Sequence, residues 1–290
     1  MSDTKALFGV RHRLGVRRLE PVPARVVRIS IAPVKSLALV HPDEVQLERG
    51  GVVGDRRFWL RDERGALYAG KRDGRMMQIR PEWDESTRRL ALTLPDGERV
   101  EGTVELGEPV EAELYRLPRA SRRVIGPWQD AISGFVGRPL ELLWADEGAV
   151  DRTPGGGTVS LVSRGSLERL RAEIGVDEDV DGRRFRMLFE VDGVDAHEED
   201  GWIGRDVRIG DARVVFNGDI GRCVVTSRHP DTGEIDLPTL VTLASYRPEG
   251  VSETLPFGVY GAVAVPGRVR VGDIAEPLSS PASLPEPATI

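Results

Sequence analysis

Glycine and proline divide this chain into short segments, and this spacing constrains the fold more than any other feature. The 290 residues include 33 glycines and 20 prolines. Long helices tolerate neither residue well, whereas the turns between short strands use both. The segments between these turns are short and rich in residues that favour strands. The pattern therefore predicts a mostly β protein with a few short helices.

Three segments carry the clearest strand predictions. The run ARVVRISIAPV (24–34) is strand-like until Pro33 interrupts it. Residues 56–70 predict a hairpin around DERG, and residues 88–106 predict another around PDG, because aspartate and glycine favour turn conformations.

Three short segments have apolar residues at helical spacing. These segments are 126–140, 165–175 and 239–247, and Gly175 is placed to end the second one. We interpret the apolar residues as packing helices onto sheets, without a chemical role. They are Trp128, Ile132 and Phe135, then Leu167, Leu170 and Ile174, then Leu240, Leu243 and Tyr246.

Composition and charge exclude several classes of protein. The chain is 40% hydrophobic and 30% charged, which is typical of a soluble globular protein with one large core or two smaller ones. Its net charge of -7 argues against a nucleic-acid partner, because phosphate binding favours a basic balance. No apolar run reaches the roughly 18 residues that span a membrane, and the start of the chain lacks an apolar signal segment. We therefore expect no membrane partner and a cytoplasmic location.

Three segments are expected to lie outside the packed core. Residues 1–23 form a basic extension, which we interpret as solvated. Residues 145–158 lose the apolar pattern and contain three consecutive glycines, which predicts a mobile loop whose role the sequence leaves open. Residues 276–290 are rich in proline and serine, which predicts a disordered tail.

The stretch GDIGRCVVTSRHPDTGEI (218–235) contains the single cysteine of the chain, Cys223. One cysteine excludes an intrachain disulfide, a cysteine-rich zinc site and a protein-bound iron–sulfur cluster. If residues 223–229 form a strand, Cys223 and His229 are about 20 Å apart, which excludes a local catalytic pair. His197 is expected on the surface. Cys223 is then either an inert buried thiol or a soft metal ligand that completes the coordination of a metal carried by an anionic cofactor.

Cationic residues recur beside predicted turns. Each one alone is most simply a surface cation, but together with a serine they could hold an anionic ligand through charge-assisted hydrogen bonds. The segments that contain them are APVKS, GDRRFW, GRRFRM and GRC. The cations include Lys35, Arg56, Arg57, Arg186 and Arg222, and the serine is Ser36.

Eight segments in order resemble the MOSC proteins with an N-terminal β-barrel domain, the group that includes the mitochondrial amidoxime-reducing component and its bacterial relatives. The resemblance covers about residues 24–275. It implies an N-terminal MOSC-associated β-barrel domain at 24–118 and a MOSC β-barrel domain at 119–275. The segments are APVKS, GDRRFWL, RRFRMLFEVDG, IGDARV, GRCVVTSRHPDTGEI, TLASYR, FGVYG and PGRVRVGD.

The resemblance implies a molybdenum cofactor, a molybdopterin whose dithiolene and phosphate accompany the metal. Cys223 matches the protein ligand of the molybdenum and is the implied catalytic residue. A single cysteine is enough because the dithiolene supplies two further sulfurs. The resemblance also implies pyridoxal phosphate binding at the level of the family, and we assign no residue of this chain to it. The positions that match cofactor-binding residues are Lys35, Ser36, Arg57, Arg186 and Arg222.

The implied reaction is the two-electron reduction of N-hydroxylated or N-oxygenated substrates. The electrons would come from an external flavin, haem or iron–sulfur protein. Two alternatives stay open. One is reduction of, or oxygen transfer on, another substrate such as a sulfoxide or a hydroxylated nucleobase. The other is a non-catalytic carrier of the cofactor or of sulfur as a Cys223 persulfide. The chain departs from the mitochondrial members by two extra residues within NGDIGRC (217–223) and by Leu188 in place of an asparagine.

Overall fold

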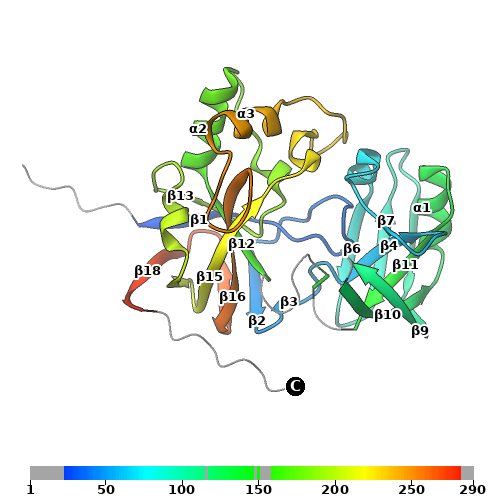
Figure 1. The fold of residues 1–290 in the computed structure, drawn as a ribbon. Coiled ribbons are helices and arrows are strands. Elements are labelled where there is room, and N and C mark those ends of the chain that lie inside the picture. The colour runs from blue at the N-terminus through cyan, green and yellow to red at the C-terminus, as the bar shows by residue number, and fades with distance from the viewer. Residues whose placement is uncertain (1–22, 115–116, 147–148, 151–157, 282–290) are drawn as a thin grey trace, which may run out of the picture.

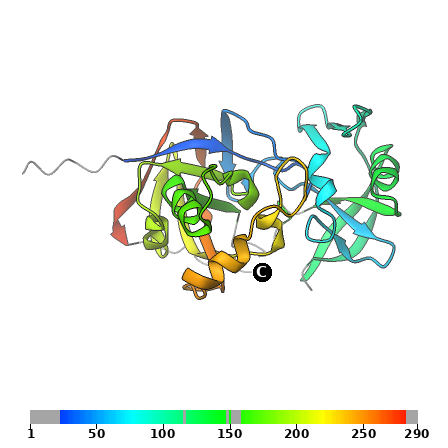
Figure 2. The ribbon, with the colours of Figure 1, turned by 90° about the horizontal axis from the view of Figure 1, so that it is seen from above.

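The computed structural model describes residues 23–114, 117–146, 149–150 and 158–281. These residues form two lobes that lie side by side in both views (Figures 1 and 2). The sequence prediction for residues 1–22 lies outside the described residues. So do the predictions for the glycine run at 151–157 and for the last nine residues, 282–290.

The first lobe, here called the barrel lobe, is built on a closed barrel of seven strands in the order β1-β13-β12-β16-β15-β14-β18. Closure leaves no exposed strand edge in the barrel. All neighbours pair antiparallel except β12 and β13, which are parallel. The strands are β1 (Ala24–Ile29), β12 (Val159–Ser163), β13 (Phe189–Asp192), β14 (Arg205–Ile209), β15 (Ala212–Gly221), β16 (Pro256–Val265) and β18 (Ile274–Pro281).

A small sheet in the order β17-β2-β3 adds to the barrel lobe. Its strands are β2 (Glu44–Glu48), β3 (Gly51–Val52) and β17 (Gly267–Arg270). Alternate residues of β2, Val45 and Leu47, are buried and join the barrel core, whereas their neighbours face solvent. This period of two is what a half-buried strand requires.

The second lobe, here called the sheet lobe, contains a five-stranded sheet, β5-β4-β11-β10-β9, and a three-stranded sheet, β6-β7-β8. Side chains from both sheets, including Phe58, Leu92 and Leu142, form one core. The strands are β4 (Phe58–Asp62), β5 (Leu67–Tyr68), β6 (Arg80–Asp84), β7 (Arg89–Thr93), β8 (Arg99–Thr103), β9 (Glu105–Leu114), β10 (Leu117–Ile125) and β11 (Leu140–Ala145). The β4–β5 and β7–β8 pairs confirm the two predicted hairpins.

Short helices cover the sheets, as the sequence predicts. The α-helices are α1 (Trp128–Val136), α2 (Arg164–Ile174) and α3 (Thr239–Tyr246), with α1 in the sheet lobe and the other two on the barrel lobe (Figure 1). Gly175 ends α2 in the left-handed conformation, with φ 78°. The 3-10 helices are η1 (Gly74–Gln78), η2 (Gly182–Phe185), η3 (Glu198–Trp202) and η4 (Val224–Ser227). The mostly β fold class with few helices is confirmed. Within the described ranges, no helix is long and apolar enough to cross a membrane.

The chain crosses between the two lobes early in the sequence. Strand β1 lies in the barrel, Val34 and Leu37 lie in the core of the sheet lobe, Val45 returns to the barrel core, and Phe58 lies again in the sheet lobe. Burying each of these side chains contributes roughly 1.5–3 kcal/mol, so all three crossings are anchored at their ends. The crossing segments therefore lie at the junction of the lobes.

The structure differs from the predicted segment boundaries. The boundary predicted between residues 118 and 119 falls inside β10, which pairs with β9 and β11 of the sheet lobe. Residues 276–281, predicted as part of a disordered tail, belong to β18, where Glu276 pairs with Arg208 and Pro277 with Val207. This part of the tail prediction is wrong because strand pairing outweighs the local proline and serine content.

His197 is not the surface residue that its acidic surroundings predict. It precedes η3 with φ 62°, and its ring lies near those of Tyr246 and Phe257, at centroid distances of 5.9 and 5.7 Å. Both ring nitrogens are buried, and the described residues offer them no hydrogen-bond partner. Burial, together with the charge of Arg247, lowers the pKa of His197 to about 4.

This lowered pKa predicts a loss of stability in mild acid. The unfolded chain binds a proton at His197 near the ordinary pKa of 6.5, but the folded protein binds it only near 4. The free energy of unfolding therefore falls as the pH drops from about 6.5 to 4, and is unaffected by this group above that range. We expect His197→Asn, which suits the left-handed backbone, to lose less stability between pH 7 and pH 4.5 than the wild type in urea unfolding. Equal losses in the two proteins would contradict this assignment.

Candidate functional site

Cys223 lies at the start of η4, directly after strand β15. Its side chain is exposed, which excludes the inert buried thiol that the sequence left open. The predicted strand over 223–229 is wrong, because the backbone turns into η4, with the Thr226 amide and hydroxyl both donating to the Cys223 carbonyl at 3.0 Å. The 20 Å separation from His229 therefore does not hold. His229 is nevertheless engaged within its own loop, where its Nδ1 accepts the Asp231 amide at 3.2 Å.

The strand before Cys223 is irregular. Its pairing with β16 shifts register between Phe216 and Gly218 and again between Asp219 and Gly221, within the segment where the sequence predicts two extra residues relative to the mitochondrial members. A shift of this kind is typical of a β-bulge, which adds a residue to one strand. The buried Asp219 carboxylate accepts the backbone amides of Ser252 at 3.2 Å and Glu253 at 2.9 Å. These bonds fix the irregular segment to the loop before β16.

Arg222 points its guanidinium into the protein. Nε donates to the Phe257 carbonyl at 2.8 Å, Nη1 donates to the Phe185 carbonyl at 3.2 Å, and Nη2 contacts the Phe257 carbonyl and the Met187 sulfur. The guanidinium also lies 5.3 Å from the centre of the Phe185 ring. The residue predicted as a cofactor ligand therefore ties the Cys223 segment to β16 and to the end of η2.

Lys35 and Ser36 lie just after the first crossing, between Val34 and Leu37 of the sheet-lobe core. The Lys35 amide donates to the Phe58 carbonyl at 2.7 Å, and its ammonium donates to the Val150 carbonyl at 3.3 Å. Ser36 has φ 76°, a left-handed conformation that costs of order 1 kcal/mol or more in a residue other than glycine.

Arg57 lies in the third crossing segment, above the ring of Trp144 at 4.3 Å from its centre. Nη1 donates to the Ala145 carbonyl at 3.4 Å, and Nη2 is 3.8 Å from the Glu85 carboxylate. Its Nε is buried and has no hydrogen-bond partner among the described residues. A buried donor left in this state costs about 1–3 kcal/mol unless a ligand or water accepts its hydrogen.

Arg186 ends η2 in the left-handed conformation, with φ 54°. Its Nη2 donates to the Leu37 carbonyl at 2.7 Å, and its own carbonyl accepts Nη2 of Arg56 at 3.0 Å. Arg56 in turn forms a 2.5 Å ion pair with the buried Asp55. The sequence GDRRFW makes Arg56 a candidate cation, but only the structure shows that it donates a hydrogen bond to the Arg186 carbonyl.

These contacts join the predicted cations into one region at the junction of the lobes. Val150 accepts Lys35 and donates its amide to the Arg56 carbonyl at 2.9 Å, and Arg56 reaches Arg186. Arg222 reaches Phe185, the residue before Arg186. These contacts therefore link Lys35, Arg56, Arg186 and Arg222 at the junction, and the exposed Cys223 directly follows Arg222 in the chain.

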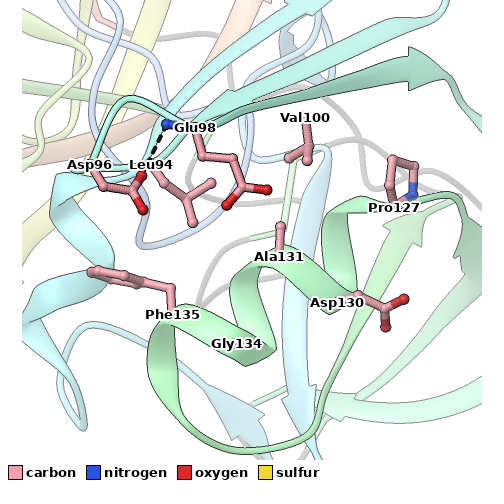
Figure 3. A pocket seen from close by; sticks show the side chains of 9 residues that line it. All are labelled: Leu94, Asp96, Glu98, Val100, Pro127, Asp130, Ala131, Gly134 and Phe135. Carbon is pink, nitrogen blue, oxygen red and sulfur yellow. Dashed lines mark hydrogen bonds between the residues drawn. The ribbon is translucent and has the colours of Figure 1, made fainter.

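Two surface hollows among the described residues lie away from this region. One, of about 500 Å³, lies between the β7–β8 turn and α1, as Figure 3 shows, and is lined by apolar side chains and by Asp96, Glu98 and Asp130. A second lies around Asp62 and Arg138. Neither includes a predicted site residue. In the described ranges no three histidine, cysteine or acidic residues cluster as a metal site.

Two family descriptions match the chain. The MOSC N-terminal beta barrel domain matches residues 23–125, and the MOSC domain matches residues 155–276. The chain is a MOSC-domain protein. The MOSC domain carries Cys223, Arg222 and Arg186, whereas Lys35 and Arg57 come from the N-terminal domain, so both domains contribute to the region.

Two kinds of related protein are similar to this MOSC protein. It is 26% identical over 289 residues to the mitochondrial amidoxime-reducing component 1 of Xenopus laevis, which covers 86% of this chain and 80% of the relative. The component 1 of Mus musculus is 37% identical over 120 residues, covering 39% of this chain and 34% of that protein. The molybdenum cofactor sulfurase of Oryza sativa subsp. japonica is 26% identical over 255 residues, which cover 76% of this chain but 30% of the sulfurase.

Proposed function

We propose that this MOSC protein holds a molybdenum cofactor and reduces N-hydroxylated or N-oxygenated substrates. The observation that carries the proposal is an exposed thiol, Cys223, beside a group of cations that the two domains bring together. The similarity to amidoxime-reducing components over most of the chain supports the substrate class.

The thiol fits the metal end of the cofactor. Cys223 is exposed, so its sulfur can bind a group that enters from outside the fold. A thiolate is a soft ligand, and the cofactor brings its own dithiolene, so one protein sulfur is enough. The backbone on both sides is fixed, by the Arg222 contacts before it and by the Thr226 bonds after it. Cys223 therefore presents its sulfur from a held position.

The cations fit the anionic end. Arg57 has a buried Nε that the described residues leave without an acceptor, and a phosphate or pterin oxygen is the kind of acceptor it lacks. Lys35 and Arg186 supply further charge from the opposite sides of the junction. Ser36, next to Lys35, offers a hydroxyl. These residues would hold the cofactor, and Arg222 would position Cys223 instead of binding the pterin.

Reduction of an N-hydroxyl group consumes two electrons and two protons and releases water. When bound, the molybdenum cofactor would supply this two-electron chemistry. A chain with one cysteine cannot hold an iron–sulfur cluster, so we propose that electrons arrive from an external flavin, haem or iron–sulfur protein.

The decisive experiment is metal and pterin analysis of protein made in a host that synthesises the cofactor, followed by turnover of a hydroxylamine-type substrate with a chemical reductant. We expect about one molybdenum per chain and release of the amine. Protein that contains pterin and molybdenum but leaves the substrate unchanged would contradict the substrate class. Protein without either would contradict the cofactor assignment.

Arg57→Ala is expected to lower the molybdenum content measured after gel filtration, because it removes a buried donor and a positive charge from the proposed anion site. The expected loss of affinity is more than about tenfold, which corresponds to ~1.4 kcal/mol. Arg61→Ala, which removes a paired arginine from β4, the strand that follows Arg57, is the control and should retain the metal. Equal retention by both variants would make Arg57 an ordinary surface cation.

A carrier function is the second candidate. The exposure of Cys223 and the match to a molybdenum cofactor sulfurase both favour it. In this case mass spectrometry should find a persulfide on Cys223 in protein without molybdenum, and no turnover should follow loading with the cofactor.

A further inference from the structure

The loop Arg228–Asp236, here called the 228–236 loop, follows η4 and contacts both lobes. Its two ends pair at an isolated bridge between Arg228 and Ile235. Within it, the His229 amide donates to the Glu234 carbonyl at 2.7 Å and the Gly233 amide donates to the His229 carbonyl at 2.8 Å. The loop is thus a closed turn that begins five residues after Cys223.

Two glycines join the tip of this loop to the sheet lobe. Gly233 is buried with φ 75°, and a Cβ added to it would overlap the carbonyl of Gly74, the first residue of η1. A Cβ added to Gly74 would likewise overlap the carbonyl of Gly233. Backbone therefore packs directly on backbone here, which only glycine permits on both sides.

Hydrogen bonds hold this contact from both lobes. On the sheet lobe, Gln78 Nε2 donates to the Thr232 carbonyl at 2.9 Å. On the barrel lobe, the Arg183 guanidinium binds both Asp231 oxygens, at 2.8 and 2.9 Å. Arg184 binds both oxygens of Asp236, at 2.5 and 2.7 Å. Bidentate pairs of this kind fix orientation as well as distance.

The elements that hold the loop also carry the site. Arg183 and Arg184 belong to η2, which Arg186 directly follows, and the loop continues from η4, which Cys223 directly precedes. A displacement of the loop would therefore move the thiol relative to Arg186, since three residues separate η4 from the paired Asp231.

We infer that the 228–236 loop positions the Cys223 thiol against the Arg186 end of η2, with η1 of the sheet lobe as its support. Gly74 and Gly233 are positioning residues. The consequence for the molybdenum cofactor rests on the proposed function, whereas the positioning of the thiol does not.

The test uses the full chain without cofactor and a nitroxide label on Cys223, which is the single cysteine and so the single attachment point. Gly233→Ala introduces the overlap with Gly74. Gly65→Ala is the matched control, because Gly65 has φ 76° and no neighbouring atom within 4 Å of an added Cβ. The two variants share the backbone strain and differ in the contact.

We expect the electron paramagnetic resonance spectrum of Gly233→Ala to shift to a more mobile line shape, and that of Gly65→Ala to match the wild type. If the two variants give the same spectrum, the inference is overturned. If Gly233→Ala does not fold, Gln78→Ala decides, since it removes one hydrogen bond without an overlap: a mobile line shape supports the inference and an unchanged one overturns it.

A second measurement separates this inference from the proposed function. Unlabelled Gly233→Ala made in a cofactor-competent host should lose molybdenum relative to Gly65→Ala. A mobile label with unchanged molybdenum content supports the positioning of the thiol and contradicts Cys223 as the metal ligand.

Discussion

We expect Cys223→Ala to abolish substrate reduction and molybdenum retention while the free energy of unfolding stays within about 0.5 kcal/mol of the wild type. The side chain is exposed and lies outside the core, so its removal leaves no cavity. The loss of metal follows because no other cysteine exists to replace the sulfur. The measurements are molybdenum content, turnover with a chemical reductant, and urea unfolding.

Cys223→Ser is the companion variant. Its hydroxyl occupies nearly the same space but is a harder donor, so it should resemble alanine in metal content. If both variants keep their molybdenum and their activity, the thiolate is not the ligand. If both lose stability by several kcal/mol, Cys223 has a structural role that its exposure does not indicate.

The local features of this fold could be predicted from sequence because their causes are local. The spacing of Trp128 and Ile132 specifies the buried face of α1, and Gly175 specifies the end of α2 through its left-handed backbone. The PDG turn likewise places Gly97 at φ 91° between β7 and β8. Each signal lies within a few residues of its effect.

The partition of the chain between the lobes could not be predicted, because it depends on distant partners. Strand β1 pairs with β13 and β18, more than 150 residues away in sequence, and so belongs to the barrel and not to the domain that follows it. Strands of similar composition, such as β4, remain in the sheet lobe. The sequence ARVVRI alone does not determine which strands will pair with it.

The candidate site also has features that the sequence predicts and features that only the structure shows. The residue types of Lys35, Arg57 and Cys223 and their positions beside turns are visible in the sequence. The contacts that join them pass through the backbone carbonyls of residues such as Val150 and Leu37, which carry no sequence signal. Arg222 shows the clearest difference between the sequence prediction and the structure. The sequence predicts that it binds the cofactor, whereas its guanidinium donates to backbone carbonyls inside the protein.

Arg222→Ala is therefore expected to destabilise the protein even without a cofactor. It removes charged donors from the Phe257 and Phe185 carbonyls, which lie among buried side chains. Charge-assisted hydrogen bonds contribute about 1.5–3 kcal/mol each, and the free acceptors add a desolvation cost. The expected loss is about 3 kcal/mol, or roughly 6–12 °C in Tm for a protein of this size. Thermal unfolding of cofactor-free protein measures it.

Arg208→Ala is the control, because it removes a solvent-exposed ion pair with Glu276 on the same lobe and should cost about 0.5 kcal/mol. Arg222→Lys should recover part of the loss, since an ammonium cannot reach both carbonyls with the planar geometry of the guanidinium. If Arg222→Ala keeps the wild-type Tm and loses only molybdenum, the residue binds the cofactor, as the family resemblance implies. Cys223→Ala is expected to lose molybdenum at wild-type stability, whereas Arg222→Ala is expected to lose stability even without a cofactor, so the two variants separate ligation from positioning of the ligand.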